Sequence, residues 1–417
     1  MVARIGYKLT EVGEIPEDWE IVQLDDIAKV TSGKRLPSGF SVTKYETPHP
    51  YIRVSDMQPG NVSTENIMYV PINAAEHIKQ YRIYKGDLFI SVAGTLGIVG
   101  KIPPELNGAN LTENADRITE IRCDKSFLLY ILLSPHTQSV IDSIRTVGAQ
   151  PKLALGRIRK FDIPLPPTEK EQIAIATALS DADALIEALE QSIAKKRHIK
   201  QGAMQELLTG KRRLPGFAGE WHILKISDIG TLKGGSTFPV SYQGGSSGEY
   251  PFFKVSDMNS VENSTVMRQA KNYISESERR SISAILFPEK SIVFAKIGAA
   301  IFLERKHILM QSSCIDNNMT AIILDNTKAD YKFFYQYLQN IKLGQFVSTT
   351  ALPSLSNTVL SVIEMKLPPT LEEQTAIAAV LSDMDDEITA LEAKLAKARQ
   401  IKIGMMQELL TGRIRLV

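Results

Sequence analysis

Glycine, lysine, histidine and cysteine residues are where chemistry would first be sought in this 417-residue sequence. The segment GTLGIVGK, from Gly94 to Lys101, has the residue types of a phosphate-binding loop, but its glycine spacing departs from that pattern by one residue. The same glycines also fail the dinucleotide-binding pattern. The six histidines contain no pair spaced four apart, and Cys123 and Cys314 are isolated, so no zinc-ligand spacing occurs.

Two further kinds of catalytic signature are missing. The sequence contains no Asn-Pro-Pro-Tyr or Asp-Pro-Pro-Tyr methyltransferase motif, and no nuclease-like cluster of carboxylates with lysine stands out. We therefore predict no catalytic residues, no metal site and no bound cofactor, and we look next for the elements that this chain would use to position binding residues.

Composition is that of a globular protein, with 43% hydrophobic and 23% charged residues, and its length indicates two or three domains. No stretch approaches the roughly 20 apolar residues of a membrane span. The first 20 residues have no apolar signal-peptide core, and the isolated cysteines fit a reducing compartment, so we expect a cytoplasmic protein. The net charge of +1 provides no overall attraction to nucleic acid, so DNA binding would need local basic patches or a partner.

A long internal repeat organises the chain. The segment that starts at Leu165 with LPPTEKEQIAIATALSD returns at Leu367 as LPPTLEEQTAIAAVLSD, and both copies end in MQELLTG, at Gly210 and Gly412. The offset is 202 residues without a gap, and about two positions in three are identical. Weaker echoes lie outside this block, including Trp19 with Trp221, PYIRVSDM with PFFKVSDM, and GAQPKLAL with TALPSLSN. The chain therefore consists of two units, each a diverged globular part followed by a nearly constant helical part.

The diverged parts are predicted to be α+β. Short strand-like runs such as GDLFISVAG, DRITEIRC, SIVFAKIG and MTAIILD are bounded by Gly, Asp and Asn. SFLLYILLSPHTQSVIDSIRT and DYKFFYQYLQNIKLGQFV have helical periodicity. Because strands and helices do not alternate regularly, a mixed α+β arrangement is favoured over βαβ units.

The constant parts are predicted to be helices of about 40 residues. Thr168 and Thr370 precede Glu171 and Glu373 by three residues, which is the capping-box pattern, and a Thr-Gly pair ends each copy. Apolar residues repeat at alternating steps of four and three, which is typical of a coiled-coil seam. The predicted seam is Ile175, Leu179, Ile186, Leu189, Ile193 and Leu207 in the first copy, and Ile377, Leu381, Ile388, Leu391, Leu395 and Leu409 in the second.

Lys200 and Lys402 interrupt this seam at equivalent positions. We expect Ile199 and Ile401 to replace them in the seam through a local stutter.

Charge predicts how the two helices pair. Each helix is acidic in its first half, for example at Asp183 and Asp385, and basic in its second half, for example at Lys195 and Lys397. Antiparallel packing places acid beside base along the whole length, whereas parallel packing places like charges together. An antiparallel pair would carry the two globular parts at opposite ends and bring the two chain termini together.

This organisation suits a reader of two separated sites, and the motifs resemble those of a known family. IPEDWE at Ile15, LPPTEKEQIAI at Leu165, QPKL at Gln150, LPPTLEEQTAI at Leu367 and both MQELLTG segments resemble the specificity subunit of type I restriction–modification enzymes. The resemblance covers essentially the whole chain, and its motifs occur twice in the same order.

The resemblance implies a DNA-binding adaptor without a catalytic centre. Each diverged part would be a target recognition domain that reads one half of a split, asymmetric sequence in double-stranded DNA, and the helices would set the spacing between halves. Two methyltransferase subunits and the restriction and motor subunits would dock on the chain. S-adenosylmethionine, Mg and ATP are expected only on those partner subunits, and no membrane partner is expected. The expected segments are target recognition domain 1 (1–165), a central helix (166–210), target recognition domain 2 (211–367) and a C-terminal helix (368–417).

Basic, amide and hydroxyl side chains in the diverged parts are the candidate DNA contacts. The first unit offers Lys34, Arg35, Arg53, Ser55, Ser91, Asn114, Gln150 and Lys152, and the second offers Lys233, Thr237, Lys254, Ser256, Lys296, Asn318 and Ser354.

Several candidates have structural alternatives. Lys34 and Arg35 also fit a solvated loop, and Asn114 and Asn318 also fit turns. Gln150 and Lys152 match the family motif, but the second copy has other residues there, which leaves a shared role open. Asp56 and Asp257 are expected to be structural, because a carboxylate repels phosphate.

Two other functions remain as alternatives. A coiled-coil scaffold that binds two protein partners without DNA would also use the repeated helices, although it has no reason to diversify only the globular parts. A DNA-modifying or DNA-cutting enzyme is opposed by the missing catalytic motifs.

Overall fold

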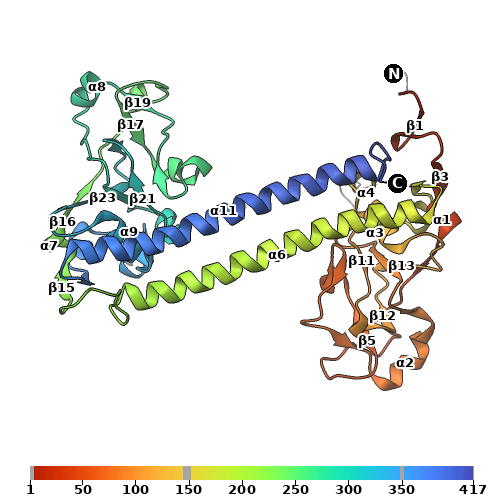
Figure 1. Cartoon of the computed structure of the whole chain (residues 1–417). Coiled ribbons are helices and arrows are strands. Elements are labelled where there is room, and N and C mark those ends of the chain that lie inside the picture. The colour runs from red at the N-terminus through yellow and green to blue at the C-terminus, as the bar shows by residue number, and fades with distance from the viewer. Residues whose placement is uncertain (1–3, 144–151, 348–351, 417) are drawn as a thin grey trace. The chain divides into compact units, whose positions relative to one another are not determined.

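The computed structural model describes residues 4–143, 152–347 and 352–416, which form two compact units. Unit 1 comprises residues 1–190 and 393–417, and unit 2 comprises residues 191–392. Two long helices, α6 (Glu169–Leu207) and α11 (Leu371–Leu409), each contribute one part to each unit (Figure 1). These compact units have different boundaries from the segments expected from the sequence. The expected segments divide the chain by repeat similarity, whereas the compact units divide it by packing, and residues of both long helices belong to each core.

Unit 1 is built around two four-stranded sheets. One is antiparallel, in the order β11-β10-β13-β4, and the other is mixed, in the order β8-β5-β12-β9, with β5 and β12 parallel. Two-stranded pairs join β1 with β2, β3 with β14 and β6 with β7. The strands are β1 (Tyr7–Thr10), β2 (Gly13–Pro16), β3 (Glu20–Gln23), β4 (Lys29–Ser32), β5 (Pro50–Ile52), β6 (Met57–Gln58), β7 (Asn61–Val62), β8 (Met68–Tyr69), β9 (Arg82–Ile83), β10 (Leu88–Ser91), β11 (Val99–Lys101), β12 (Ala109–Leu111), β13 (Ala115–Thr119) and β14 (Asp162–Leu165).

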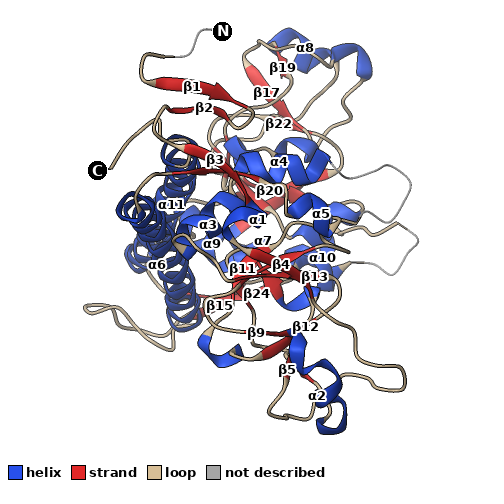
Figure 2. Cartoon of the chain, turned by 90° about the vertical axis from the view of Figure 1, so that its right-hand side faces the viewer, coloured by secondary structure: helices blue, strands red, loops and turns tan. Residues whose placement is uncertain are grey.

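Short helices flank these sheets, and Figure 2 shows them among the strands. They are α1 (Leu24–Ile27), α2 (Ile72–Ile78), α3 (Lys125–Leu133), α4 (Pro135–Ser143) and α5 (Leu155–Ile158). The single helix predicted over SFLLYILLSPHTQSVIDSIRT is divided in the structure, because Pro135 interrupts the backbone hydrogen bonding and starts α4.

Unit 2 follows the same scheme with a larger sheet. The order is β16-β23-β20-β21-β18 in a five-stranded sheet and β19-β17-β22 in a three-stranded sheet, while β15 pairs with β24. Strands β17 and β22 are parallel, as β5 and β12 are in unit 1. The strands are β15 (His222–Lys225), β16 (Gly230–Gly234), β17 (Tyr250–Phe253), β18 (Val266–Met267), β19 (Tyr273–Ile274), β20 (Ile292–Ala295), β21 (Lys306–Leu309), β22 (Cys314–Ile315), β23 (Met319–Leu324) and β24 (Glu364–Leu367), and the short helices are α7 (Ile226–Ile229), α8 (Glu276–Ser281), α9 (Tyr331–Gln339) and α10 (Asn357–Ser361). The predicted α+β class with an internal repeat is confirmed.

The ends of the long helices follow from their sequence. The Thr168 and Thr370 hydroxyls accept hydrogen bonds from the Glu171 and Glu373 amides at 3.3 Å, as the capping-box pattern predicts. Both helices stop before a glycine with positive φ, +71° at Gly210 and +68° at Gly412. This left-handed conformation is the common helix stop, and glycine adopts it without a Cβ clash.

Each unit draws its main core from both long helices. In unit 1, α6 contributes Ile175 and Leu179, and α11 contributes Met406 and Leu409. Seam positions near the helix ends are buried, whereas the middles of the helices have both buried and half-buried ones. The buried positions are Ile175, Leu179, Ile193, Leu207, Ile377, Leu381, Ile388 and Leu409, and the half-buried ones are Ile186, Leu189, Leu391 and Leu395.

Ion pairs within each unit confirm the antiparallel pairing of the helices. In unit 1, Arg399 of α11 contacts Glu190 of α6 at 2.6 Å, and Lys402 contacts Asp183 at 2.5 Å. Unit 2 has the mirrored arrangement, in which basic residues of α6 contact acidic residues of α11. Its pairs are Lys196 with Glu387 at 2.6 Å, Arg197 with Glu392 at 2.5 Å, and Lys200 with Asp385 at 2.5 Å.

The predicted stutter at the lysines is wrong. Ile199 and Ile401 are 47% and 51% exposed, whereas the side chains of Lys200 and Lys402 are only 17% and 22% exposed. The lysines keep their seam positions because each aliphatic stem lies along the helix pair while its ammonium reaches a carboxylate of the opposite helix.

The two ends of the described chain meet in unit 1, as predicted. The Tyr7 hydroxyl donates to the carbonyl oxygen of Gly412 at 3.3 Å, and Arg415 donates to the Asp18 carboxylate at 3.0 and 3.1 Å. The Arg415 guanidinium also donates to the buried Glu171 carboxylate and lies 6.0 Å from the Trp19 ring centroid. The N-terminal segment therefore completes a unit whose helices come from distant parts of the chain.

Candidate nucleic-acid interface

Most of the predicted contacts of unit 1 gather at one end of its antiparallel sheet. Strand β4 ends at Ser32 opposite Asp116, and β10 ends at Ser91 opposite Ala115, so the segments after β4 and β10 lie beside the segment that precedes β13. Hydrogen bonds join them, from the Gly33 amide to Ala115 O and from the Val92 amide to Asn114 O. This end of the sheet carries Lys34, Arg35, Asn114 and Lys152, the last through its bridge with Ala93.

Unit 2 repeats this arrangement at the corresponding end of its sheet. Strand β16 ends at Gly234 opposite Thr320, and β20 ends at Ala295 opposite Met319. The Lys296 amide donates to Asn318 O at 2.8 Å, and Ile297 bridges Ser354. The candidates that gather here are Lys233, Thr237, Lys296, Asn318 and Ser354. Both units therefore present equivalent segments with different side chains.

One glycine in each unit lets the backbones at this end approach closely. A Cβ on Gly33 would collide with the carbonyl oxygens of Leu111 and Thr112, and a Cβ on Gly235 would collide with those of Ile315 and Asp316. The two glycines lie 202 residues apart, in SGKRLP at Ser32 and KGGSTFP at Lys233, so both copies of the repeat have the same steric need for glycine at this position.

The lysine and arginine side chains at these sheet ends differ in exposure and in their contacts within the protein. Lys34 is exposed, and its ammonium lies 5.6 Å from the Tyr81 ring centroid. Arg35 is exposed as well, but its Nε donates to Glu113 at 2.6 Å. Lys233 is exposed and Lys296 is half-buried, with its ammonium close to Gly234. Lys152 is exposed too, so Lys34, Lys152 and Lys233 are the candidates whose charge is most accessible to a phosphate.

Arg53 and Lys254 occupy matching positions but are held by neighbours. Arg53 donates to both Asp56 carboxylate oxygens, at 2.7 and 3.0 Å, and this hydrogen bonding raises the arginine pKa. Lys254 donates to the Gln243 side chain at 3.0 Å. Ser55 and Ser256, two residues further along, are exposed in short 3-10 turns.

The aspartates of the two VSDM segments are structural, as expected. Asp56 and Asp257 are 4% and 2% exposed, and their carboxylates accept the backbone amides of Arg53 and Lys254 at 2.9 and 2.8 Å.

Three of the predicted contacts need comment. Ser91 is fully buried, and its hydroxyl donates to Thr95 O at 2.6 Å and accepts the Ile98 amide at 2.8 Å. The prediction that Ser91 contacts DNA is therefore corrected, because its hydroxyl builds the turn between β10 and β11. Asn318 has an exposed side chain, while its backbone N–H donates to the Asp316 carboxylate at 3.0 Å in the expected turn. Gln150 lies outside the described residues.

A basic cluster that the sequence did not indicate extends this surface in unit 1. Tyr81 lies between Lys34 and Arg117, whose guanidinium is 5.8 Å from the same ring. Arg117 donates to the carbonyl oxygens of Gln80 and Arg82 at 3.0 and 2.7 Å, and burial lowers its pKa. The sequence feature that could have indicated Arg117 is its position in DRITEIRC, where a charged residue lies within a strand-like run.

In each unit an arginine contacts a buried glutamate at the start of a long helix. In unit 2, Arg213 donates to both oxygens of Glu373 and lies 5.8 Å from the Trp221 ring centroid. This arrangement corresponds to Arg415 with Glu171 and Trp19, 202 residues away. The carboxylates have side chains only 1% exposed, so these contacts are structural.

The part of the chain that the structure describes offers no candidate metal-binding group. Within residues 4–143, 152–347 and 352–416, no group of three or more His, Cys, Asp or Glu side chains is placed to hold a metal. Burial raises the pKa of both Cys123 and Cys314 to about 11, which disfavours their reactive thiolates. None of the described helices combines the length and apolar character that a bilayer span requires.

Comparison with known proteins gives a consistent family match. The model of the type I restriction modification DNA specificity domain matches twice, over residues 16–196 and 218–400. A protein of Methanocaldococcus jannaschii named for the specificity subunit of the type I restriction enzyme MjaX is 27% identical over 98% of this chain and 97% of its own length. The MjaIX specificity subunit of the same organism is 23% identical over 98% and 96%.

Solved structures share the fold. The S subunit of a type I restriction–modification system from M. genitalium aligns with a TM-score of 0.58, at 17% identity, over 96% of this chain and 97% of that one. A chain from a study of complex assembly and conformational transition in a type I restriction–modification system aligns with a TM-score of 0.57, at 16% identity, over 96% and 99%.

Proposed function

This chain belongs to the family of type I restriction modification DNA specificity domains, and from this premise we propose that it directs a methyltransferase and restriction complex to a split DNA sequence. Each unit recognises one half of an asymmetric target in double-stranded DNA. The chain itself carries out no catalysis. In this proposal residues 1–165 and 211–367 are the two target recognition domains, and residues 166–210 and 368–417 are the long helices that join them.

The observation that carries the proposal is the equivalence of the two sheet ends. Both units bring the segments after two neighbouring strands next to the segment before a third, through matching hydrogen bonds. The framework is the same, but the exposed side chains differ, with Lys34 and Arg35 in unit 1 and Lys233 and Thr237 in unit 2. Equal frameworks with different side chains are what two half-sites of unequal sequence require.

The proposed DNA contacts of unit 1 are Lys34, Arg35, Ser55, Asn114 and Lys152, with Arg53 and Arg117 supporting them. The proposed contacts of unit 2 are Lys233, Thr237, Ser256, Lys296, Asn318 and Ser354, with Lys254 in the supporting position. Lysine and arginine supply phosphate contacts that set position, while amide and hydroxyl groups have the donors and acceptors that distinguish base edges.

Partner subunits complete the proposed assembly. Two methyltransferase subunits and the restriction and motor subunits bind the chain, and S-adenosylmethionine, Mg and ATP reside on them. An apolar groove of about 510 Å³ between α6 and α11 in unit 1, which Leu185, Leu189, Ala398 and Met405 help to line, is consistent with protein docking on the helices.

Base-resolution mapping of DNA methylation tests the proposal. The host genome is sequenced with and without this gene, in both cases with the gene of its methyltransferase partner present. We expect a bipartite methylated motif that requires this chain, and the motif identifies both half-sites and their spacing. If the complex is soluble and the methyltransferase active, but no motif depends on this chain, a scaffold that binds protein partners without DNA is the better account.

A further inference from the structure

The internal repeat allows the two units to be compared residue by residue where α3 and α9 begin. Asp124 caps α3 by accepting the Phe127 amide at 2.7 Å, and Asp330 caps α9 by accepting the Phe333 amide at 2.8 Å. The amide of each aspartate donates to a buried glutamine of the following long helix, Gln172 in one unit and Gln374 in the other. These contacts fix the register of the comparison, in which each α3 residue corresponds to the α9 residue 206 positions later.

In this register Ile131 of unit 1 corresponds to Tyr337 of unit 2. The Tyr337 side chain packs against the core of unit 2, which includes Met204 and Leu208 from the end of α6. Burial raises the pKa of Tyr337, and the nearby backbone of Lys366 in β24 partly offsets this rise. The Tyr337 ring therefore packs on the core of unit 2 and lies near β24.

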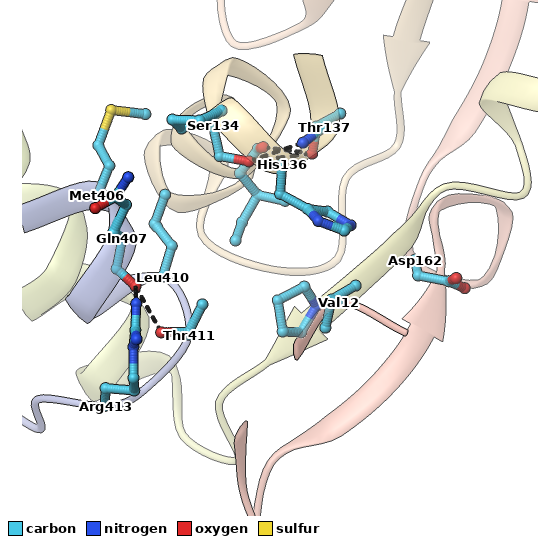
Figure 3. A pocket seen from close by; sticks show the side chains of 13 residues that line it. Val12, Ser134, His136, Thr137, Asp162, Met406, Gln407, Leu410, Thr411 and Arg413 are labelled. Carbon is cyan, nitrogen blue, oxygen red and sulfur yellow. Dashed lines mark hydrogen bonds between the residues drawn. The ribbon is translucent and has the colours of Figure 1, made fainter. Parts of the chain in front are cut away.

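Unit 1 has a cavity at the equivalent place. A pocket of about 110 Å³ lies between the α3–α4 junction, β14 and the end of α11 (Figure 3). Its lining includes Ile131, Pro164, Met406 and Leu410, and the last two correspond to Met204 and Leu208. Val12, which also lines it, corresponds to the larger Leu214. The shorter side chain at position 131 thus leaves room that the tyrosine ring takes in unit 2.

Four of the polar side chains that line this pocket already have partners within the chain. The Ser134 hydroxyl contacts the Thr137 hydroxyl, which donates to Ile131 O, and Thr411 donates to Gln407 O. Arg413 pairs with Glu408 at 3.2 Å. These four groups, satisfied within the chain, offer an occupant little beyond apolar contact, and the paired arginine does not mark the pocket for a phosphate.

We propose that the Ile131 pocket is a socket for a phenylalanine side chain of a partner polypeptide. Its size is comparable to apolar cavities on the order of 150 Å³ that accept a benzene ring, and here the pocket also opens to the surface. The internal counterpart of the occupant is the Tyr337 ring. A tyrosine is disfavoured in unit 1, because Pro164 replaces Lys366 and has no backbone N–H to offer the hydroxyl.

The socket distinguishes the two units for a docking partner. A subunit that approaches either unit meets similar helix ends, with the MQELLTG segment in both, but only the Ile131 side offers this pocket to an aromatic anchor. Anchors of this kind carry much of the binding energy of protein interfaces. The inference rests on the proposed function, since it requires a protein partner.

Methionine methyl NMR of the full-length chain tests whether the socket accepts an aromatic ring. Toluene, the side-chain analogue of phenylalanine, is titrated into protein with labelled methionine methyl groups. We expect the Met406 signal to shift and the equivalent Met204 signal to stay, and p-cresol to act more weakly than toluene. Ile131→Phe should abolish the Met406 shift, and Tyr337→Ile should create a toluene-dependent shift at Met204. An unchanged Met406 signal in the wild-type protein overturns the inference.

Titration with the methyltransferase subunit tests the docking role. We expect Ile131→Phe to weaken the binding of one methyltransferase subunit about 30-fold. Methionine methyl signals remote from the pocket that match those of the wild type show that this variant folds. If the wild-type chain assembles with the methyltransferase and Ile131→Phe assembles equally well, the pocket has no docking role. The inference then fails, while the proposed function stands. If the wild-type chain itself neither assembles nor directs methylation, the proposed function fails.

Discussion

Lys34, one of the proposed DNA contacts, shows how the fold holds the backbone of a single exposed cation. It lies two residues after the end of β4, its backbone amide donates to Leu111 O at 2.8 Å, and its carbonyl oxygen accepts the Tyr51 hydroxyl at 3.1 Å. The backbone is therefore fixed on both sides while the ammonium remains exposed beside Tyr81. A cation held in this way contacts a phosphate with little loss of backbone entropy.

Lys34→Ala should weaken DNA binding by the assembled complex and reduce its salt dependence. One lost phosphate contact lowers the slope of log K against log salt by about 1, uniformly across sequences. Lys29→Ala is the matched control, because Lys29 starts the same strand at its other end and pairs with Glu120 at 2.9 Å. Fluorescence anisotropy at several salt concentrations measures both. Equal slopes for the two variants would remove Lys34 from the interface.

Arg415 is expected to be the most sensitive residue near the chain end. Arg415→Ala leaves the Glu171 carboxylate buried without its guanidinium, which should cost about 3 kcal/mol of unfolding free energy. Urea unfolding measures this loss. Adding Glu171→Gln to Arg415→Ala should recover part of the stability, because the buried charge is gone. A double variant less stable than Arg415→Ala would contradict this account. Arg213→Ala with Glu373→Gln offers the same comparison in unit 2.

His307 should make unit 2 sensitive to acid. Its side chain is 2% exposed, and burial lowers its pKa to about 4. Below the ordinary histidine pKa of about 6.5 the unfolded chain binds a proton that the folded chain does not, so stability falls as the pH decreases from 6.5 toward 4. The expected loss between pH 7 and pH 5 is about 2 kcal/mol in urea unfolding. His307→Asn should lack this contribution, and an identical pH dependence in both proteins would refute it.

At the scale of elements, glycines in and after the long helices have opposite roles. Gly412 has a φ of +68°, and a Cβ there would lie 2.6 Å from Pro16, so Gly412→Ala should destabilise the protein by at least about 1 kcal/mol. Gly404 lies inside α11 with open space around it, so Gly404→Ala should stabilise by up to about 1 kcal/mol. Thermal unfolding compares the two. A destabilising Gly404→Ala would show that the helix needs flexibility at that position.

Charge and periodicity predicted the helical elements well. The alternation of acidic and basic halves led to the antiparallel pairing, and the ion pairs of Lys402 with Asp183 and Lys200 with Asp385 follow from it. The expected replacement of these lysines by Ile199 and Ile401 was wrong, because hydrophobicity alone does not account for an amphipathic side chain with a partner carboxylate in reach.

The candidate interface was harder to predict than the helices. Sequence echoes located the segments that meet at the sheet ends, but they did not show which side chains point outward. Ser91 lies at a strand end in a Gly-rich context like an exposed residue, yet its hydroxyl bonds within the turn. Arg117 and Tyr81 come together only through the pairing of β9 with β12 and the packing of β12 beside β13, which no local pattern contains.

For the whole molecule, the proposal predicts independent recognition by the two units. Replacement of residues 20–160 with the equivalent segment of a relative should change one half of the methylated motif and leave the other half and the methylation activity intact. Methylation mapping of the chimera provides the measurement, and the reciprocal exchange in unit 2 is the control. A chimera that alters both halves would show that the units share their DNA contacts.

The construction of each compact unit from both long helices has a consequence for how such a chain arises. A gene with one copy of the repeat would encode a module whose helix lacks its antiparallel neighbour. Two such chains would have to associate, so that the end of each helix completes the core of the other module. Duplication and fusion of that gene would yield one polypeptide that contains both helices. In that polypeptide the N-terminal and C-terminal segments meet through the contact between the Tyr7 hydroxyl and Gly412 O. The nearly identical helix segments are also where crossing over between related genes can exchange one diverged module without disturbing the packing of either unit.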